Sequence, residues 1–257
     1  MPCQSLQAGY APRWQTWRVP DDLPSRLILW DIDHTLVETR GLGSELYRRA
    51  FEAVTGRPMR QQADVTGQTE PAILAATLRL HGIEDDQPYQ KRYAEALTAE
   101  YERHQEELRR RVLPGAREAL IALAGQPTVV QAVLSGNLKD VSVIKLRTFA
   151  LDRYIDIESG SYGDDDTHRP NLVAIAQRRA RRRHSSAFTR TNTIVVGDSV
   201  QDVQTGHDGG ARVVAVASGR DDASVLRAAG AELVWTDLTD TDHVVQVLAL
   251  GDAEENA

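Results

Sequence analysis

Hydrophobic residues gather in short continuous runs, and longer stretches with helical periodicity separate them. The runs are RLILWDI, TVVQAVLS, TIVVGD, RVVAVAS and ELVW, at residues 26–32, 128–135, 193–198, 212–218 and 232–235. A strand needs such continuous apolar character when both of its faces are buried. The pattern therefore predicts an α/β fold, in which helices wrap a parallel sheet. A further short strand is expected at 154–159.

One interval departs from this alternation. Between the first two runs lie roughly ninety residues without a strand pattern, and they favour helices over 43–56, 69–82 and 87–112. The first two of these helices end in glycine, which is frequent at helix C-termini. We therefore expect a helical insertion over 42–111, directly after the first strand.

The rest of the chain divides around this insertion. Residues 26–41 and 112–250 are expected to form the α/β core, and 42–111 the inserted helical domain. Residues 1–25 lack periodicity and 251–257 are acidic and polar. Both ends are therefore expected to be loosely held, as an N-terminal extension and a C-terminal tail.

Composition narrows the possible partners and location. The 257 residues carry 30 Lys and Arg against 37 Asp and Glu, a formal net charge of −7. This charge gives no overall attraction for nucleic acid or for an anionic membrane. Cys3 is the single cysteine, so no internal disulfide can form. No apolar run reaches the length of a signal peptide or a spanning helix. We expect a cytoplasmic protein without a nucleic-acid or membrane partner.

Candidate chemistry begins where the first predicted strand ends, in Asp31-Ile32-Asp33-His34-Thr35. Alternation along a strand places Asp31 and Asp33 on one side, at the strand end where open α/β sheets bind ligands. Two adjacent carboxylates repel each other unless a cation or a shared proton compensates. The pair therefore indicates a metal site. The alternative is a polar strand end whose aspartates cap the next segment.

Two later strand ends carry similar groups. The third run ends in Gly197-Asp198. Asp202 follows within one helical turn of Asp198. Asp198 could be another oxygen ligand for a hard divalent cation, or simply a helix cap, and Asp202 could support a nearby cation. At the end of the second run stands Ser135, followed by Gly136-Asn137. Its hydroxyl, flexible turn and amide suit phosphate oxygens, although a strand-to-helix turn capped by Asn137 would look the same.

Together these sites resemble the motifs of the haloacid dehalogenase superfamily of phosphatases, over essentially 26–240. Asp31-x-Asp33-x-Thr35 matches the first motif, Ser135 the second, and Gly197-Asp198 with Asp202 the fourth. The similarity is strongest to the phosphoglycolate phosphatase and β-phosphoglucomutase branch. It implies a Rossmann-like core, with the inserted helical domain as a cap.

The third motif of that family is a cationic residue, usually Lys. Arg169 in Asp-Thr-His-Arg-Pro is the best match here, with Arg-Pro in place of Lys-Pro. Arginine keeps the charge but replaces a compact ammonium with a planar fork. The competing candidate is Lys145, which we expect on the surface of a core helix because it lies only ten residues after Ser135.

The resemblance also implies roles. Asp31 would attack phosphorus and form an aspartyl-phosphate, and Asp33 would serve as general acid and base. Mg²⁺ would be held by Asp31, the Asp33 main-chain carbonyl and Asp198, and Asp202 would orient Arg169. The groups implied to hold phosphate or substrate are Thr35, Ser135, Gly136, Asn137, Arg169 and, from a cap loop, Thr66 and Gln68. The expected partner is a small phosphorylated metabolite.

His34 stands where most relatives have glycine. Either the position tolerates any residue, because only its backbone matters, or the imidazole contacts substrate and shifts the optimum pH. The arginine-rich run 178–183 is expected to be a solvated helix face, with binding of an acidic partner as the alternative.

Other functions remain open at this point. A phosphomutase of the β-phosphoglucomutase type would share the core, and a non-catalytic binding protein could use the same fold. A dehalogenase is disfavoured by Asp33, because that chemistry has no leaving alkoxide to protonate. A phosphonatase would need a cap lysine for a Schiff base, and Lys91 is expected on a helix surface.

Overall fold

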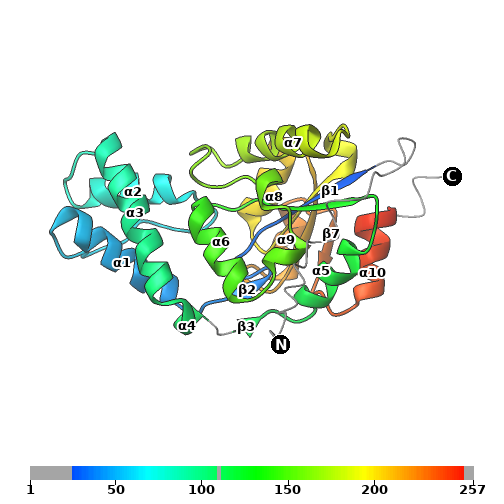
Figure 1. Ribbon diagram of the computed structural model, residues 1–257, viewed down its shortest axis with the longest axis horizontal. Coiled ribbons are helices and arrows are strands. Elements are labelled where there is room, and N and C mark those ends of the chain that lie inside the picture. The colour runs from blue at the N-terminus through cyan, green and yellow to red at the C-terminus, as the bar shows by residue number, and fades with distance from the viewer. Residues whose placement is uncertain (1–24, 109–110, 252–257) are drawn as a thin grey trace, which may run out of the picture.

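The computed structural model describes residues 25–108 and 111–251. Residues 1–24 of the expected N-terminal extension, with Cys3, and residues 252–257 of the expected tail lie outside the described residues. Figure 1 shows an α/β core on one side and a group of helices, the cap, on the other.

The core is a five-stranded parallel sheet, and each of the five apolar runs contains one of its strands. The strand order is β4-β1-β5-β6-β7. The strands are β1 (Arg26–Trp30), β4 (Val129–Val133), β5 (Thr193–Gly197), β6 (Arg212–Val216) and β7 (Leu233–Trp235). The predicted α/β class with a Rossmann-like parallel sheet is confirmed.

Helices cover both faces of this sheet. They are α5 (Ala116–Ala124), α6 (Lys139–Thr148), α7 (Asn171–His184), α8 (Val200–Gly209), α9 (Ala223–Ala228) and α10 (Thr241–Val245), which a π-helix at Gln246–Leu250 extends. On β1, Ile28 and Trp30 pack in the cluster that contains α5 and α10. Leu27 and Leu29 pack in the cluster with α7, as the two-residue period of a strand requires.

The cap comprises α1 (Leu42–Thr55), α2 (Glu70–Leu80), α3 (Gln87–Arg103) and α4 (Gln105–Leu108). Its hydrophobic cluster contains residues of α1, α2 and α3, and it also takes in Val141 and Ile144 of the core helix α6. Leu146 and Phe149, from the end of the same helix, belong to the core cluster. Helix α6 thus lies between cap and sheet (Figure 1).

The expected helix over 87–112 is confirmed as far as Arg103 and is wrong at its C-terminal end. Helix α3 ends at Arg103, where the ring of His104 hydrogen-bonds to the Glu100 carbonyl oxygen at 2.9 Å. After α4, β3 (Arg111–Val112) pairs antiparallel with β2 (Val37–Glu38). The two connections between core and cap therefore run side by side, a two-residue pairing too short to show as an apolar run.

The expected strand at 154–159 is also wrong. This segment forms two 3₁₀ turns, Asp152–Tyr154 and Ile157–Ser159. The Asp156 carboxylate accepts hydrogen bonds from the Glu158 backbone and the Ser159 hydroxyl. Such local bonds compete with a strand ladder.

Two surface expectations can be compared with the structure. On α7, Arg178, Arg181, Arg182 and Arg183 are exposed. Arg179 and Arg183 form ion pairs with Asp165 and Asp156. Only part of the run is therefore a free solvated face. The side chain of Lys91 is 80% exposed, as expected. None of the described helices is long and apolar enough to cross a membrane.

Candidate active site

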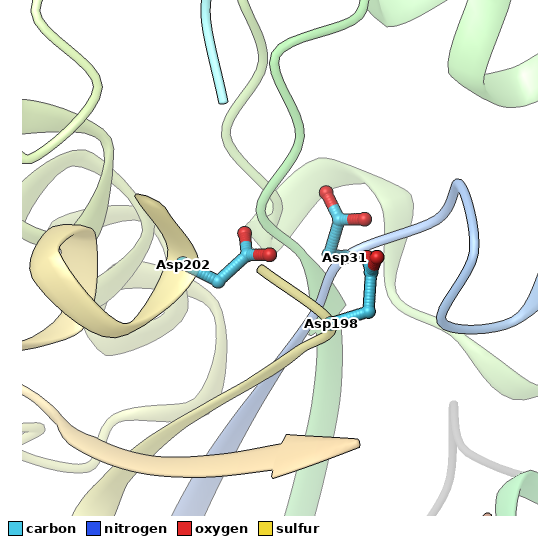
Figure 2. Close-up of side chains that lie close together, drawn as sticks. All are labelled: Asp31, Asp198 and Asp202. Carbon is cyan, nitrogen blue, oxygen red and sulfur yellow. The ribbon is translucent and has the colours of Figure 1, made fainter. Parts of the chain in front are cut away.

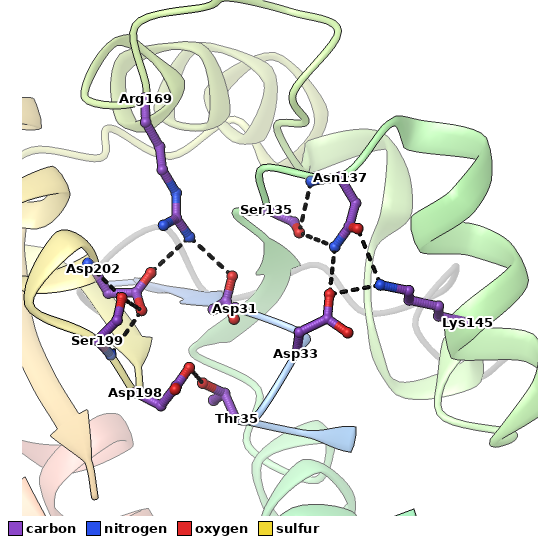
Figure 3. Close-up of polar contacts among 10 residues, drawn as sticks. All are labelled: Asp31, Asp33, Thr35, Ser135, Asn137, Lys145, Arg169, Asp198, Ser199 and Asp202. Carbon is purple, nitrogen blue, oxygen red and sulfur yellow. Dashed lines mark hydrogen bonds and ion pairs between the residues drawn. The ribbon is translucent and has the colours of Figure 1, made fainter. Parts of the chain in front are cut away.

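The sheet topology brings the polar strand ends together. Because β1 lies between β4 and β5, the residues that follow these three strands meet at one edge. Asp31 and Asp33 come from β1, Ser135 and Asn137 from the end of β4, and Asp198 from the end of β5. Figure 3 shows these side chains converging with Arg169, Asp202 and Lys145.

Arg169, from the loop before α7, joins two of the carboxylates. Its Nη2 donates to Asp31 Oδ1 at 2.9 Å and to Asp202 Oδ1 at 2.6 Å, and the residue is only 8% exposed. Asp202 is itself fixed, because its Oδ2 accepts from the backbone and hydroxyl of Ser199 at the start of α8. Arg169 Nε is buried and has no hydrogen-bond partner. A donor beside Asp31 therefore remains for a ligand.

The same region crowds negative charge. Asp31, Asp198 and Asp202 each place an oxygen within 4.8 Å of the others, and Figure 2 shows the three carboxylates facing one another. Burial, followed by the charge of Asp202, raises the pKa of Asp31 well above its usual value. The same two causes raise the pKa of Asp198 to about 8. A cation at this point would relieve the repulsion.

Asp198 lies in a space shaped for its carboxylate. Thr35 Oγ1 donates to Asp198 Oδ1 at 3.3 Å. A Cβ on Gly219 would lie 1.7 Å from Asp198 Oδ2, so the loop after β6 needs glycine there. The oxygen donor set fits a hard divalent ion. Asp202 joins this cluster in addition to its predicted role beside Arg169.

Asp33 forms an ion pair with a second cation, Lys145, on the other side of the site. Lys145 Nζ donates to Asp33 Oδ2 at 2.6 Å and to Asn137 Oδ1 at 3.0 Å, and Asn137 Nδ2 donates to Asp33 Oδ2 at 2.7 Å. Burial favours the neutral form of Asp33. Lys145 and these hydrogen bonds outweigh it, so the pKa of Asp33 is lowered.

The expectation that Lys145 lies on a helix surface is therefore wrong. Lys145 is 3% exposed and points into the site from α6 (Figure 3). The sequence did contain an indication that Lys145 is buried. Lys145 follows Val141 by four residues and therefore lies on the same, buried face of the helix. The pairing with Asp33 compensates its charge.

The predicted phosphate loop is close to the cap. Ser135 Oγ accepts from the Asn137 backbone and side chain at 3.2 and 2.9 Å. A Cβ on Gly136 would lie 2.1 Å from the Gln68 carbonyl oxygen. The Gly136 carbonyl accepts from the Glu70 backbone at 2.8 Å. Glycine is therefore needed at 136 for the close approach of a cap segment.

His34 has a left-handed backbone, with a φ of 62°. Non-glycine residues rarely adopt this conformation, so the backbone here favours glycine, although histidine adopts it. That the imidazole contacts substrate stays a prediction. The His34 carbonyl accepts from Ser218 Oγ at 2.6 Å, which helps to hold the turn. His34 is one of the residues that line the cavity.

A cavity of about 400 Å³ lies between core and cap. Each of the predicted site residues except Thr35 lines it, including Thr66 and Gln68 of the cap loop. The lining also includes Glu70, Tyr101 and Lys145, which sequence reasoning did not assign to the site. Burial raises the pKa of Glu70 to about 7 and that of Tyr101 to about 12.

The sequence matches the haloacid dehalogenase-like hydrolase family over residues 28–216. The chain belongs to this family, and the motif resemblance is confirmed. A comparison with the curated proteins gives no significant sequence match.

Solved structures share the fold. A hydrolase from Pseudomonas syringae is 23% identical, with a TM-score of 0.64, covering 87% of this chain and 99% of its own. A predicted phosphoglycolate phosphatase from Haemophilus somnus is 18% identical, with a TM-score of 0.60 and coverage of 86% and 98%. The protein CbbY from Rhodobacter sphaeroides, solved with phosphate, is 19% identical, with a TM-score of 0.58 and coverage of 84% and 96%. At such identities the likeness shows the fold alone.

Proposed function

We propose that this hydrolase is a Mg²⁺-dependent phosphatase that acts on a small phosphate monoester through an aspartyl-phosphate. The observation that carries the proposal is the arrangement around Asp31. A buried carboxylate lies beside Arg169, whose Nε has no partner, and Ser135, whose hydroxyl accepts from Asn137 and keeps its own proton to donate, lines the same cavity. These donors suit the oxygens of a transferring phosphoryl group.

In the first step a carboxylate oxygen of Asp31 forms a bond to phosphorus while the bond between phosphorus and the alcohol oxygen breaks. The proton of the Asp33 carboxyl passes to that oxygen, and the neutral alcohol leaves. The substrate phosphate brings negative charge beside Asp33, which opposes Lys145 and favours the protonated form of Asp33.

In the second step Asp33, now ionised, takes a proton from water, and the water oxygen attacks phosphorus. The bond between phosphorus and Asp31 breaks, which releases phosphate and restores Asp31 as a carboxylate and Asp33 as a carboxyl group. Arg169 holds the phosphoryl oxygens in both steps, and Asp202 orients Arg169. Mg²⁺ held by Asp31, Asp198 and the Asp33 main-chain carbonyl would offset the charge of the nucleophile and the phosphate.

The cavity supports a substrate with a single phosphate. The described cap residues that line it are Gly43, Ser44, Tyr47, Gln62, Val65, Thr66, Gly67, Gln68, Glu70, Ile73 and Tyr101. None of these is Lys, Arg or His, whereas a mutase has to hold a second phosphate away from the reacting one. Arg220 is the cation of the described lining that neither Asp31 nor Asp33 engages, and it is exposed. This distribution favours hydrolysis over the mutase alternative, with a small phosphorylated metabolite as partner.

The test is a phosphatase assay on the purified protein with Mg²⁺. The panel holds p-nitrophenyl phosphate, phosphoglycolate, sugar phosphates and nucleotides, and Asp31→Asn is the inactive control. We expect phosphate release that Asp31→Asn abolishes. No release from any ester would overturn the proposal and favour a binding protein on the same fold. Transfer of phosphate between two hydroxyls of a sugar would identify a mutase.

A further inference from the structure

Lys145 is a buried cation that the proposed reaction leaves without a task. It enters the site from α6, opposite Arg169, and it is 3% exposed. Its Nζ lies 5.3 Å from the centre of the Tyr101 ring of cap helix α3. A lysine buried in this way has given up its hydration, so the contacts that it makes in the site must compensate.

The contacts form a closed ring. Lys145 donates to Asp33 Oδ2 and to Asn137 Oδ1, and Asn137 donates to the same Asp33 oxygen, at 2.6, 3.0 and 2.7 Å. Each side chain is therefore held by the other two, which fixes their rotamers. Asp33 Oδ1 accepts no hydrogen bond from the part of the chain that the structure describes. Of the two Asp33 carboxylate oxygens, Oδ1 is therefore the one that can carry the proton that is transferred.

We propose that Lys145 is a positioning residue for proton transfer to the leaving group. The inference rests on the proposed function, since Asp33 is the acid in that reaction. Lys145 and Asn137 anchor Oδ2, so that Oδ1 stays at the oxygen that departs as the alcohol. The proton moves from Oδ1 to that oxygen as the phosphorus bond breaks, and Lys145 keeps its own protons throughout. Misplacement by about 1 Å is costly in such a step.

The two cations of the site therefore act on different parts of the substrate. Arg169 contacts Asp31 and lies on the side of the phosphate, which is common to every substrate. Lys145 contacts Asp33 and lies on the side of the leaving group, which differs between substrates. A variant of Lys145 should therefore discriminate between leaving groups, and a variant of Arg169 should not.

The experiment compares two esters with Lys145→Met, which keeps much of the side-chain volume and removes the charge. An alkyl phosphate needs a proton on its leaving oxygen, whereas p-nitrophenolate leaves readily without one. We expect kcat/KM for the alkyl ester to fall ~100-fold or more, the lower range for a positioned general acid. For p-nitrophenyl phosphate we expect a loss below about tenfold. The value of kcat/KM depends only on the steps up to departure of the alcohol. Later hydrolysis of the aspartyl-phosphate therefore does not affect the comparison.

The chain offers a matched control on the same helix. The Lys139 side chain is 37% exposed and pairs with Glu158 on the surface. Lys139→Met should therefore leave kcat/KM unchanged for both esters. Lys145→Arg should recover part of the alkyl phosphate activity, because it restores a donor to Asp33. If Lys145→Met does not fold, as judged by its thermal unfolding, Lys145→Gln serves for the same comparison.

Equal losses for the two esters would overturn the proposal, because a purely structural or general electrostatic role acts on both. Unchanged activity on the alkyl phosphate would overturn it as well. Failure of the proposed function looks different: the wild-type protein would then hydrolyse neither ester with Mg²⁺.

Discussion

Arg169→Ala tests most directly whether Arg169 binds the phosphate. It removes the two charged contacts to Asp31 and Asp202 at 2.9 and 2.6 Å, and the free Nε donor beside them. Loss of one positioned donor to a developing charge lowers kcat by ~10²–10³. Because phosphate is common to all substrates, we expect similar losses in kcat/KM for alkyl and p-nitrophenyl esters.

The same substitution should also cost stability. It leaves buried carboxylates without their cation, and breaking a buried ion pair in this way costs about 3–5 kcal/mol. That is a large part of the 5–15 kcal/mol that a typical domain has. Urea unfolding measures this loss, and the rates are compared at a temperature at which the variant is folded.

Arg169→Lys is the control for the charge alone. A single ammonium substitutes for the field but not for the fork that reaches Asp31, Asp202 and a ligand together. We expect it to recover part of the rate that alanine loses. If Arg169→Ala keeps more than a tenth of wild-type kcat/KM while folded, the placement of Arg169 at the phosphate is wrong.

Three further predictions follow from the carboxylates. Asp31→Asn should abolish turnover while far-ultraviolet circular dichroism stays unchanged, and more than a tenth of wild-type activity would contradict its role as nucleophile. Chelation with EDTA should stop hydrolysis and added Mg²⁺ should restore it; an undiminished rate in chelator would exclude the oxygen-ligand site. Burial raises the pKa of Glu70 to about 7, so its neutral form favours the folded state at low pH and this stability is lost as pH rises through 7. The free energy of unfolding of Glu70→Gln relative to wild type should therefore rise between pH 5 and 8, by at most about 3 kcal/mol as measured by urea unfolding. A difference in unfolding free energy that stays constant over this pH range would refute the shifted pKa.

The parallel sheet could be predicted because strands buried on both faces must be apolar throughout. The predicted metal and phosphate residues also meet, since the carboxyl ends of neighbouring parallel strands share an edge. Sequence reasoning named Lys145 as the competing cation but placed it on the helix surface, because it relied on the distance along the chain from Ser135. The register of Lys145 on α6 places it among buried positions. The pairing of β2 with β3 involves two residues in each strand, and no hydrophobic period can show so short an element.

Helix α6 has a consequence for how the molecule unfolds and for how it could be rebuilt. Val141 and Ile144 pack into the cap cluster, and Leu146 and Phe149 pack into the core. One rigid helix thus contributes to two hydrophobic clusters, and neither can melt without disturbing the other. Cap and core should therefore unfold in a single cooperative transition. A cap transplanted from another family member would need the outer face of α6 to come with it.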